Sequence, residues 1–257
     1  MAGSMRHAVA MAVNRTIKPL GLKLSRADGH DWTNQEHFIP YEATIKAARE
    51  AGLSVGAYID TVMNLTPGAT DQTIEGMRRL GVFSQPITTV VEIGPGSGRY
   101  LERTIAACSP ARYEVYETAA PWAAHLAREY KVLAHPTDGK SLDATPAESA
   151  DLVQAHKVFS SITFMATCRY WPEIVRVTRP GGFAVFDLLT ESCLDPETFD
   201  RWAASGINAG TYPATVPAAA ATGYFTSRGF ALVGSFFVPM GPGRTETFVF
   251  RKADAAK

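Results

Sequence analysis

The chain has 257 residues, of which 46% are hydrophobic, and it carries 25 basic and 25 acidic residues. This apolar content is enough for a substantial core, which excludes a disordered chain. The balanced charge argues against a dedicated nucleic-acid-binding protein, because such proteins usually have a basic excess. The apolar runs are too short for a membrane span, and the three cysteines lack the spacing of a disulfide framework or a zinc site. We therefore expect a globular protein of the reducing cytoplasm.

The first part of the chain, residues 6–70, is predicted to be a helical extension. Its helices are expected at residues 6–18, 41–51 and 54–63. The basic residues of the first helix either contact an anionic surface or face the solvent. The extension is expected to serve as a lid, as a contact between two copies of the chain, or as an arm that faces a membrane.

The rest of the chain, residues 71–257, is predicted to form one α/β domain that starts with a helix at residues 71–80. Strands are then expected at residues 88–93, 112–116, 131–134, 151–155 and 182–188, and helices at 98–107, 120–129, 166–178 and 195–205. This alternation is typical of a doubly wound, Rossmann-like parallel sheet. Two further strands, at residues 230–238 and 245–250, flank a short turn and should pair antiparallel. We thus expect a seven-stranded sheet of five parallel strands plus a C-terminal antiparallel hairpin.

A glycine-rich loop follows the first predicted strand. Gly94, Gly96 and Gly98 let the backbone turn tightly and let a ligand approach, because glycine has no Cβ. A strand, a glycine loop and a helix with unpaired N–H groups at its start together bind nucleotide-like cofactors. A dinucleotide site would have the spacing G-x-G-x-x-G, whereas this loop has G-x-G-x-G. Glu92, two residues before the first glycine, argues against a pyrophosphate and favours a ligand with a positively charged end.

Two polar residues end later strands, where open α/β sheets bind their ligands. Glu117 follows the second strand, and its two carboxylate oxygens can accept hydrogen bonds from both hydroxyls of a ribose. Alternatively, it caps the helix that follows. His156 follows the fourth strand, and an imidazole with an ordinary pKa of about 6.5 suits the removal of a hydroxyl proton. The alternatives are that His156 has a structural role or that the neighbouring Lys157 acts instead.

These features together resemble the class I S-adenosylmethionine (SAM) methyltransferases. The segment Arg179-Pro180-Gly181-Gly182 resembles the turn before the fifth strand of that superfamily, and the resemblance covers residues 71–252. It implies the seven-stranded methyltransferase fold, SAM as the cofactor and S-adenosylhomocysteine as the product. Asp138 and Gly139, which otherwise form an Asp-Gly turn, match the loop that meets the adenine ring. The implied cofactor site comprises Glu92, Gly94, Gly96, Gly98, Glu117, Thr118, Asp138 and Gly139.

Within this superfamily, residues 187–191 and 241–246 are similar to bacterial sugar O-methyltransferases. This resemblance implies that the acceptor is a hydroxyl of a carbohydrate or glycolipid, with His156 as the catalytic base. The acceptor pocket is expected over the ends of the fourth and fifth strands, next to a long connection at residues 191–229. The candidate substrate-binding residues are Asp187, Glu191, Trp202 and Tyr212. No metal is expected, because no pair of aspartates typical of metal-assisted methyltransferases is evident; the alternative is that Asp187 and Glu191 hold a cation.

Other interpretations stay open from the sequence. One is a methyltransferase of nitrogen atoms, nucleic acid or protein. The end of the fourth strand, Gln154-Ala155-His156-Lys157, lacks the (Asp/Asn)-Pro-Pro-Tyr signature of enzymes that methylate base amino groups. Another is a SAM-binding module without catalytic activity. A nicotinamide dehydrogenase is disfavoured by the glycine spacing and by Glu92.

Overall fold

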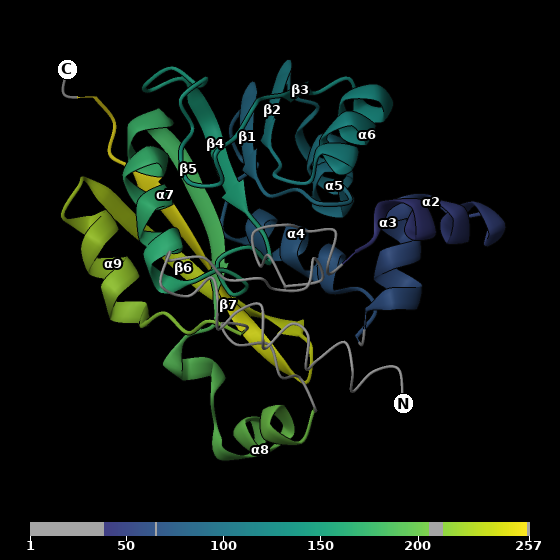
Figure 1. The fold of residues 1–257 in the computed structure, drawn as a ribbon. Coiled ribbons are helices and arrows are strands. Elements are labelled where there is room, and N and C mark those ends of the chain that lie inside the picture. Colours follow the sequence, from purple (N-terminus) through teal and green to yellow (C-terminus); the bar gives the residue numbers. More distant parts are fainter. Residues whose placement is uncertain (1–38, 65, 206–212, 256–257) are drawn as a thin grey trace, which may run out of the picture. The chain divides into compact units, whose positions relative to one another are not determined.

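Seven strands pair in one sheet in the order β3-β2-β1-β4-β5-β7-β6 (Figure 1). The structure is a computed structural model, and it describes residues 39–64, 66–205 and 213–255. The strands are β1 (Thr89–Ile93), β2 (Arg112–Tyr116), β3 (Leu133–Ala134), β4 (Ala150–Ala155), β5 (Thr178–Leu188), β6 (Phe230–Met240) and β7 (Gly243–Lys252). Each predicted strand is present, which confirms the α/β fold. The helix predicted at residues 6–18 lies outside the described residues.

Strand direction also follows the prediction. Strands β1 to β5 are parallel, and β7 is antiparallel to both of its neighbours, β5 and β6. The sheet grows from β1 through β2 to β3 on one side and from β1 through β4 to β5 on the other. Because the strand order reverses between β1 and β4, a crevice is expected at their carboxyl ends, and ligands bind there in open α/β sheets.

Alternating side chains of the strands form a hydrophobic core on each face of the sheet. Val91 and Val153 belong to the core beneath α7 and α9, whereas Val90 and Leu152 belong to the core beneath α4, α5 and α6. All four are buried, as expected for parallel strands covered on both faces. The helices that cover the two faces are α4 (Ala69–Arg79), α5 (Arg99–Cys108), α6 (Ala120–Tyr130), α7 (Phe164–Val177) and α9 (Ala218–Thr226). A further short helix, α8, spans Pro196–Ala204.

The two described N-terminal helical segments are also present, as α2 (Tyr41–Glu50) and as α3 (Val55–Tyr58) continued by the π-helix η3 (Ile59–Met63). The Trp122 indole on α6 donates a hydrogen bond to the carbonyl of Ile39, 2.8 Å away. This contact connects the start of the described chain to α6. All described residues belong to one compact unit, Trp32–Lys257, and the predicted domain boundary at residue 70 stays a prediction. None of the described helices has the length and apolar character that crossing a membrane requires.

Three elements differ from the prediction. The strand expected at residues 131–134 is shorter, because Lys131 adopts a left-handed conformation with φ 56° at the end of α6. β5 starts before residue 182, because Thr178 already pairs with Ala150 of β4. The helix α9 is not predicted, because its alanine-rich sequence lacks the apolar periodicity that marks a helix.

Candidate active site

The glycine loop after β1 turns tightly into α5. Gly94, Gly96 and Gly98 have positive φ angles of 59°, 55° and 83°, which glycine adopts without strain. A Cβ on Gly98 would lie 2.4 Å from Leu126 of α6, and one on Gly94 would lie 2.8 Å from Val158. Backbone conformation and packing therefore both require glycine at these two positions. Gly96 lines a cavity beside the loop, so a ligand in that cavity can approach the backbone directly.

Glu117 connects the end of β2 to this loop. Its carboxylate accepts hydrogen bonds from the backbone N–H groups of Gly96 (2.7 Å) and Ala119 (2.8 Å), and the residue is buried. A carboxylate offers more acceptor positions than these two bonds use. The structure thus shows a contact that stabilises the start of α6 and the loop together, while ribose binding by Glu117 stays a prediction.

The segment after β3 forms an Asp-Gly turn, which was the alternative to adenine binding for Asp138 and Gly139. Asp138 Oδ1 accepts hydrogen bonds from the backbone N–H groups of Lys140 (2.9 Å) and Ser141 (2.8 Å), and its side chain is largely exposed. Gly139 has φ 73°, and a Cβ there would lie 3.4 Å from the methyl group of Thr118. Thr118 and Gly139 are therefore neighbours, whereas the carboxylate of Asp138 binds its own loop. The predicted contacts of all three residues with the cofactor stay predictions.

Glu92 lies in the core and is not part of the cavity wall. Its carboxylate accepts a hydrogen bond from the Tyr113 hydroxyl at 2.5 Å, and the Gln154 amide donates to that hydroxyl at 2.9 Å. Burial raises the pKa of Glu92 to about 7, although hydrogen bonds from Tyr113 and Gln154 act in the opposite direction. The carboxylate is therefore partly protonated at neutral pH. Its partners are side chains of β2 and β4, and contact with the cofactor stays a prediction.

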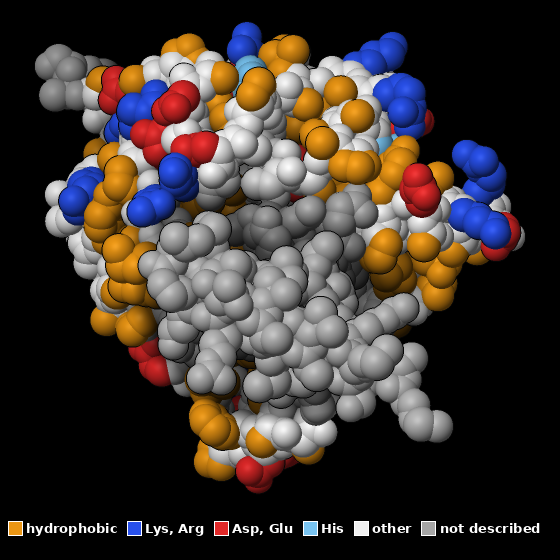
Figure 2. Space-filling model, viewed as in Figure 1, with side chains coloured by type: hydrophobic (Ala, Val, Ile, Leu, Met, Phe, Trp, Pro, Cys, Tyr) orange, Lys and Arg blue, Asp and Glu red, His pale blue; other side chains and the backbone are white. Residues whose placement is uncertain are grey.

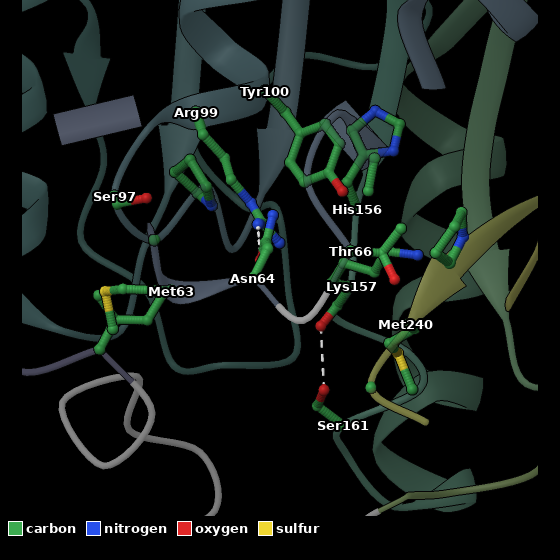
Figure 3. A pocket seen from close by; sticks show the side chains of 16 residues that line it. Met63, Asn64, Thr66, Ser97, Arg99, Tyr100, His156, Lys157, Ser161 and Met240 are labelled. Carbon is green, nitrogen blue, oxygen red and sulfur yellow. Dashed lines mark hydrogen bonds between the residues drawn. The ribbon is translucent and has the colours of Figure 1, made fainter. Parts of the chain in front are cut away.

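The cavity has a volume of about 250 Å³ and lies at the carboxyl ends of β1 and β4 (Figure 3). Its wall combines the glycine loop, the start of α5, the end of β4, the segment after η3 and the end of β6. Arg99 and Lys157 contribute basic side chains to this wall, and no described residue contributes a carboxylate. Among the described residues, the wall therefore presents basic side chains and no acidic one.

His156 belongs to the cavity wall, at the end of β4. Its ring stacks on the ring of Tyr100 with centroids 4.6 Å apart, and its Nε2 is buried without a hydrogen-bond partner. Burial lowers the pKa of His156 to about 4; Asp187 opposes this shift, while the charges of Lys157 and Arg99 add to it. The imidazole is therefore neutral at physiological pH. In the tautomer that leaves Nε2 unprotonated, this nitrogen is a proton acceptor without a hydrogen-bond partner.

Lys157 is held in place by Asp187. Its backbone is left-handed, with φ 60°, and its N–H donates to Asp187 Oδ1 at 2.5 Å. Its Nζ lies 3.3 Å from Asp187 Oδ2 and donates to the Thr245 hydroxyl. Burial acts to raise the pKa of Asp187, but Lys157 and the hydrogen bonds outweigh it, and the net shift is downward. Asp187 thus positions a residue of the wall without belonging to the wall itself, and its contact with substrate stays a prediction.

Glu191 and Trp202 also lie outside the cavity wall. Glu191 accepts a hydrogen bond from the backbone N–H of Ala218 at the start of α9, at 2.9 Å. Trp202 on α8 packs against the turn between β6 and β7, where a Cβ on Gly241 would lie 3.1 Å from its ring. Because Gly241 lines the cavity, Trp202 supports that part of the wall. Tyr212 lies outside the described residues, and substrate binding by these residues stays a prediction.

The sequence did not identify three residues of the wall, Asn64, Arg99 and Tyr100. Arg99 donates a hydrogen bond to Asn64 Oδ1 at 2.7 Å, and its guanidinium carbon lies 4.9 Å from the centroid of the Tyr100 ring (Figure 3). The position of Arg99 and Tyr100 directly after Gly98 is a usable signal, because the first residues of such a helix face the ligand. No comparable signal marks Asn64, which is distant from the loop in the sequence.

Within the described ranges, no group of three or more His, Cys, Asp or Glu side chains is arranged to hold a metal ion. All three cysteines are free. Burial raises the pKa of the Cys108 thiol to about 11, so this thiol is inert as a nucleophile at neutral pH. Independence from metal stays a prediction.

Residues 91–186 match the family model described as "Methyltransferase domain". The match spans β1 to β5 and includes the glycine loop, Glu117 and His156. Among curated proteins, none matches the chain. Residues 91–186 are thus similar to a methyltransferase domain, and this stretch contains the glycine loop and the end of β4 that border the cavity.

Solved structures with the same fold differ in acceptor and reaction. An O-methyltransferase family protein from Burkholderia thailandensis has a TM-score of 0.60 and 15% identity, over 87% of this chain and 64% of that one. The N-methyltransferase NodS from Bradyrhizobium japonicum WM9 was solved with S-adenosyl-L-homocysteine. It has a TM-score of 0.56 and 18% identity, over 81% of this chain and 98% of that one. The [4+2]-cyclase SpnF has a TM-score of 0.55 and 14% identity, over 72% of this chain and 81% of that one. Identities this low establish a shared fold and leave the acceptor open.

Proposed function

We propose that the chain is a SAM-dependent O-methyltransferase that transfers a methyl group to a hydroxyl of a small molecule, either a sugar or a glycolipid. The observation that carries this proposal is the position of His156. A neutral imidazole with an unpartnered Nε2 lies in the wall of the cavity that the glycine loop also lines. A hydroxyl must lose its proton as it is methylated, so a proton acceptor beside the cofactor loop is what this reaction needs.

The residues around the glycine loop fit SAM. The loop offers backbone without side chains at its glycines, and Glu117 offers carboxylate oxygens for the ribose hydroxyls. Thr118 and Gly139, which lie side by side, extend this site toward the adenine ring. When bound, SAM supplies a methyl group on a positively charged sulfur, which is already a good electrophile.

The residues of the chain then align the acceptor and remove its proton. Tyr100 holds the imidazole of His156 by ring stacking, and burial, aided by the charges of Lys157 and Arg99, keeps the imidazole neutral. The unprotonated Nε2 would take the hydroxyl proton as the acceptor oxygen forms its bond to the methyl carbon, the bond between sulfur and methyl breaks, and S-adenosylhomocysteine leaves. Alignment and exclusion of water supply much of the rate enhancement, and the general base contributes roughly 10²–10⁴-fold.

The charge of the cavity supports a hydroxyl over an amine as the acceptor. Most aliphatic amines are cations at neutral pH and need a carboxylate or another anionic group nearby. In the described wall, Arg99 and Lys157 are basic and no residue is acidic, so the wall offers no carboxylate to hold a cationic acceptor. A sugar hydroxyl carries no charge and does not need such a partner.

The dimensions and surface charge support a small acceptor. The cavity of about 250 Å³ suits part of a small molecule, because ligand pockets usually have volumes of roughly 300–1,000 Å³. On the face that Figure 2 shows, Lys and Arg side chains are mixed with Asp and Glu among the coloured residues. A nucleic-acid acceptor would favour a basic surface instead.

The N-terminal helices support a second contact. Val62 on η3 is apolar, with 57% of its surface accessible, whereas the neighbouring Met63, 40% accessible, also lines the cavity. Exposed apolar side chains of this kind favour a homodimer contact or attachment to a membrane surface. The three free cysteines support a location in the reducing cytoplasm.

A SAM-binding protein that does not methylate is the second candidate. The pKa of about 4 makes His156 a weak base at neutral pH. The likeness to a [4+2]-cyclase also supports this candidate, because that protein combines the same fold with another reaction.

Calorimetry with SAM and S-adenosylhomocysteine, followed by a methyl-transfer assay on monosaccharides, glycolipids and amines, tests the two candidates. The proteins are the wild type, His156→Ala and the control His125→Ala, which alters a buried histidine of α6 outside the cavity wall. Transfer to a hydroxyl that only His156→Ala loses is the expected result. Binding without transfer to any acceptor favours the second candidate. If the folded wild type binds neither ligand, both candidates are wrong.

A further inference from the structure

Arg99 brings into the cavity a positive charge that no described carboxylate neutralises. Its guanidinium donates to the amide oxygen of Asn64 and lies over the face of the Tyr100 ring. Lys157, the other basic residue of the wall, pairs with Asp187 instead. In the described wall, Arg99 is thus the basic residue whose charge is available to an anionic group of a ligand.

The amide of Asn64 is oriented by a second residue. Its Nδ2 donates to Asp60 Oδ1 at 3.0 Å, and its Oδ1 accepts from Arg99 at 2.7 Å. A carboxylate accepts hydrogen bonds only, and a guanidinium donates only, so the two neighbours fix which end of the amide faces which partner. Asp60, Asn64 and Arg99 therefore form one directed chain of hydrogen bonds that ends at the cavity.

Asp60 is well placed to hold this chain rigid. It is 5% exposed and lies in the π-helix η3, a rare element that is frequent at functional sites. Besides Asn64, its carboxylate accepts hydrogen bonds from the Thr70 hydroxyl (2.7 Å) and from the backbone N–H of Gly68 (3.1 Å). These bonds fix the segment after η3, which forms one side of the cavity.

We propose that Asp60 positions Arg99 through Asn64, so that the guanidinium binds a carboxylate group of the ligand in the cavity. A planar guanidinium matches a carboxylate with two parallel hydrogen bonds, and Asn64 occupies only one of its nitrogen atoms among the described contacts. Tyr100 lines the same cavity, and its buried hydroxyl has no partner, so it is a further hydrogen-bond donor for such a group. The inference rests on the proposed function, because the carboxylate belongs either to the amino-acid half of the cofactor or to the acceptor.

The test compares two ligands that differ in the carboxylate. S-adenosylhomocysteine carries the amino-acid half, and 5′-methylthioadenosine shares the adenosine but lacks that half. If the cofactor supplies the carboxylate, Arg99→Gln weakens binding of S-adenosylhomocysteine roughly 10–100-fold and leaves 5′-methylthioadenosine unchanged. If the acceptor supplies it, both affinities stay the same, while kcat/KM falls for glucuronate and not for glucose. Arg103→Gln, on the same helix and paired with Asp71, is the matched control with no change expected.

The positioning role of Asp60 and Asn64 has its own test. Asn64→Ala and Asp60→Asn are expected to reduce the same carboxylate-dependent affinity, but to add nothing when combined with Arg99→Gln. Additive losses would show a general structural effect and overturn the positioning role. If Arg99→Gln leaves S-adenosylhomocysteine binding unchanged and the wild type does not prefer glucuronate over glucose, the carboxylate site is wrong while the proposed function stands. If the folded wild type binds neither adenosine ligand, the proposed function itself is wrong, and this inference falls with it.

Discussion

The carboxylate of Glu117 accepts a hydrogen bond from the backbone N–H of Gly96 across 2.7 Å, which makes the end of β2 and the glycine loop after β1 one unit. The same carboxylate is the predicted anchor of the ribose. A change at Glu117 therefore acts on the ligand and on the loop beside it.

Glu117→Ala is expected to weaken binding of S-adenosylhomocysteine roughly 10–100-fold, because it removes acceptors of charge-assisted hydrogen bonds. Glu117→Gln keeps one carbonyl acceptor and should lose less. Calorimetry measures both, with Glu129→Gln, an exposed residue of α6, as the control. Equal affinities in all four proteins would exclude a role for Glu117 in cofactor binding.

His156→Ala is expected to reduce kcat about 10²–10⁴-fold while the affinity for S-adenosylhomocysteine stays close to that of the wild type. The pH dependence gives a second measurement. Since burial lowers the pKa of His156 to about 4, kcat/KM should decline on the acidic side near pH 4 and not near the ordinary value of 6.5. An acidic decline centred near 6.5 that persists in His156→Ala would assign the base to another residue.

Gly98→Ala is expected to destabilise the protein more than Gly68→Ala. Both glycines precede a helix with nearly the same φ, 83° and 82°, so the backbone strain of alanine is similar, about 1–2 kcal/mol. A Cβ at Gly68 meets nothing within 4 Å, whereas one at Gly98 would lie 2.4 Å from Leu126. Overpacking should add about 1–3 kcal/mol at Gly98. Urea unfolding measures the difference in unfolding free energy between the two variants. Equal losses of unfolding free energy in Gly98→Ala and Gly68→Ala would rule out the close packing of the loop against α6.

Glu92→Gln is expected to change how stability depends on pH. The pKa of Glu92 rises from 4.5 to about 7 on folding, so its favourable contribution is complete below pH 4.5 and is lost as the pH rises through 7. Between pH 5 and pH 8 the wild type should therefore lose up to about 3 kcal/mol of unfolding free energy relative to Glu92→Gln. Burial of neutral His156 acts in the opposite direction, from pH 6.5 down toward pH 4, but it is common to both proteins and cancels. Parallel stability curves in urea would contradict the raised pKa.

Lys157→Met is expected to destabilise the protein by about 3–5 kcal/mol, because it leaves Asp187 as an uncompensated charge in the core. The double variant Lys157→Met with Asp187→Leu should recover a large part of this loss. Urea unfolding of the two variants and the wild type measures the recovery. A double variant as unstable as the single one would show that the pair contributes little through its charge.

The sequence predicted the central elements because their signals are local. The apolar run of β1, the positive-φ glycines and the alternation up to β5 each depend on neighbouring residues, and the structure confirms them. Elements without such a signal were missed or shifted. The alanine-rich α9 has apolar residues all around, and the predicted strand at residues 131–134 is shortened because Lys131 belongs to the end of α6.

The site was harder to predict, because its side chains meet only after folding. Glu92 has a position typical of a cofactor residue, yet its carboxylate turns to Tyr113 on the neighbouring strand. Arg99 and Asn64 are 35 residues apart in sequence and meet in the wall of the cavity. No spacing rule links such a pair, since the contact depends on how the segment after η3 packs against α5.

The place of β7 in the sheet has a consequence for folding during synthesis. β6 is made before β7, but in the sheet β7 lies between β5 and β6 and provides the backbone pairing of both. When β6 leaves the ribosome it therefore has no strand to join, and β5 still has an open edge. The sheet therefore closes only after β7 has become available to pair with both β5 and β6.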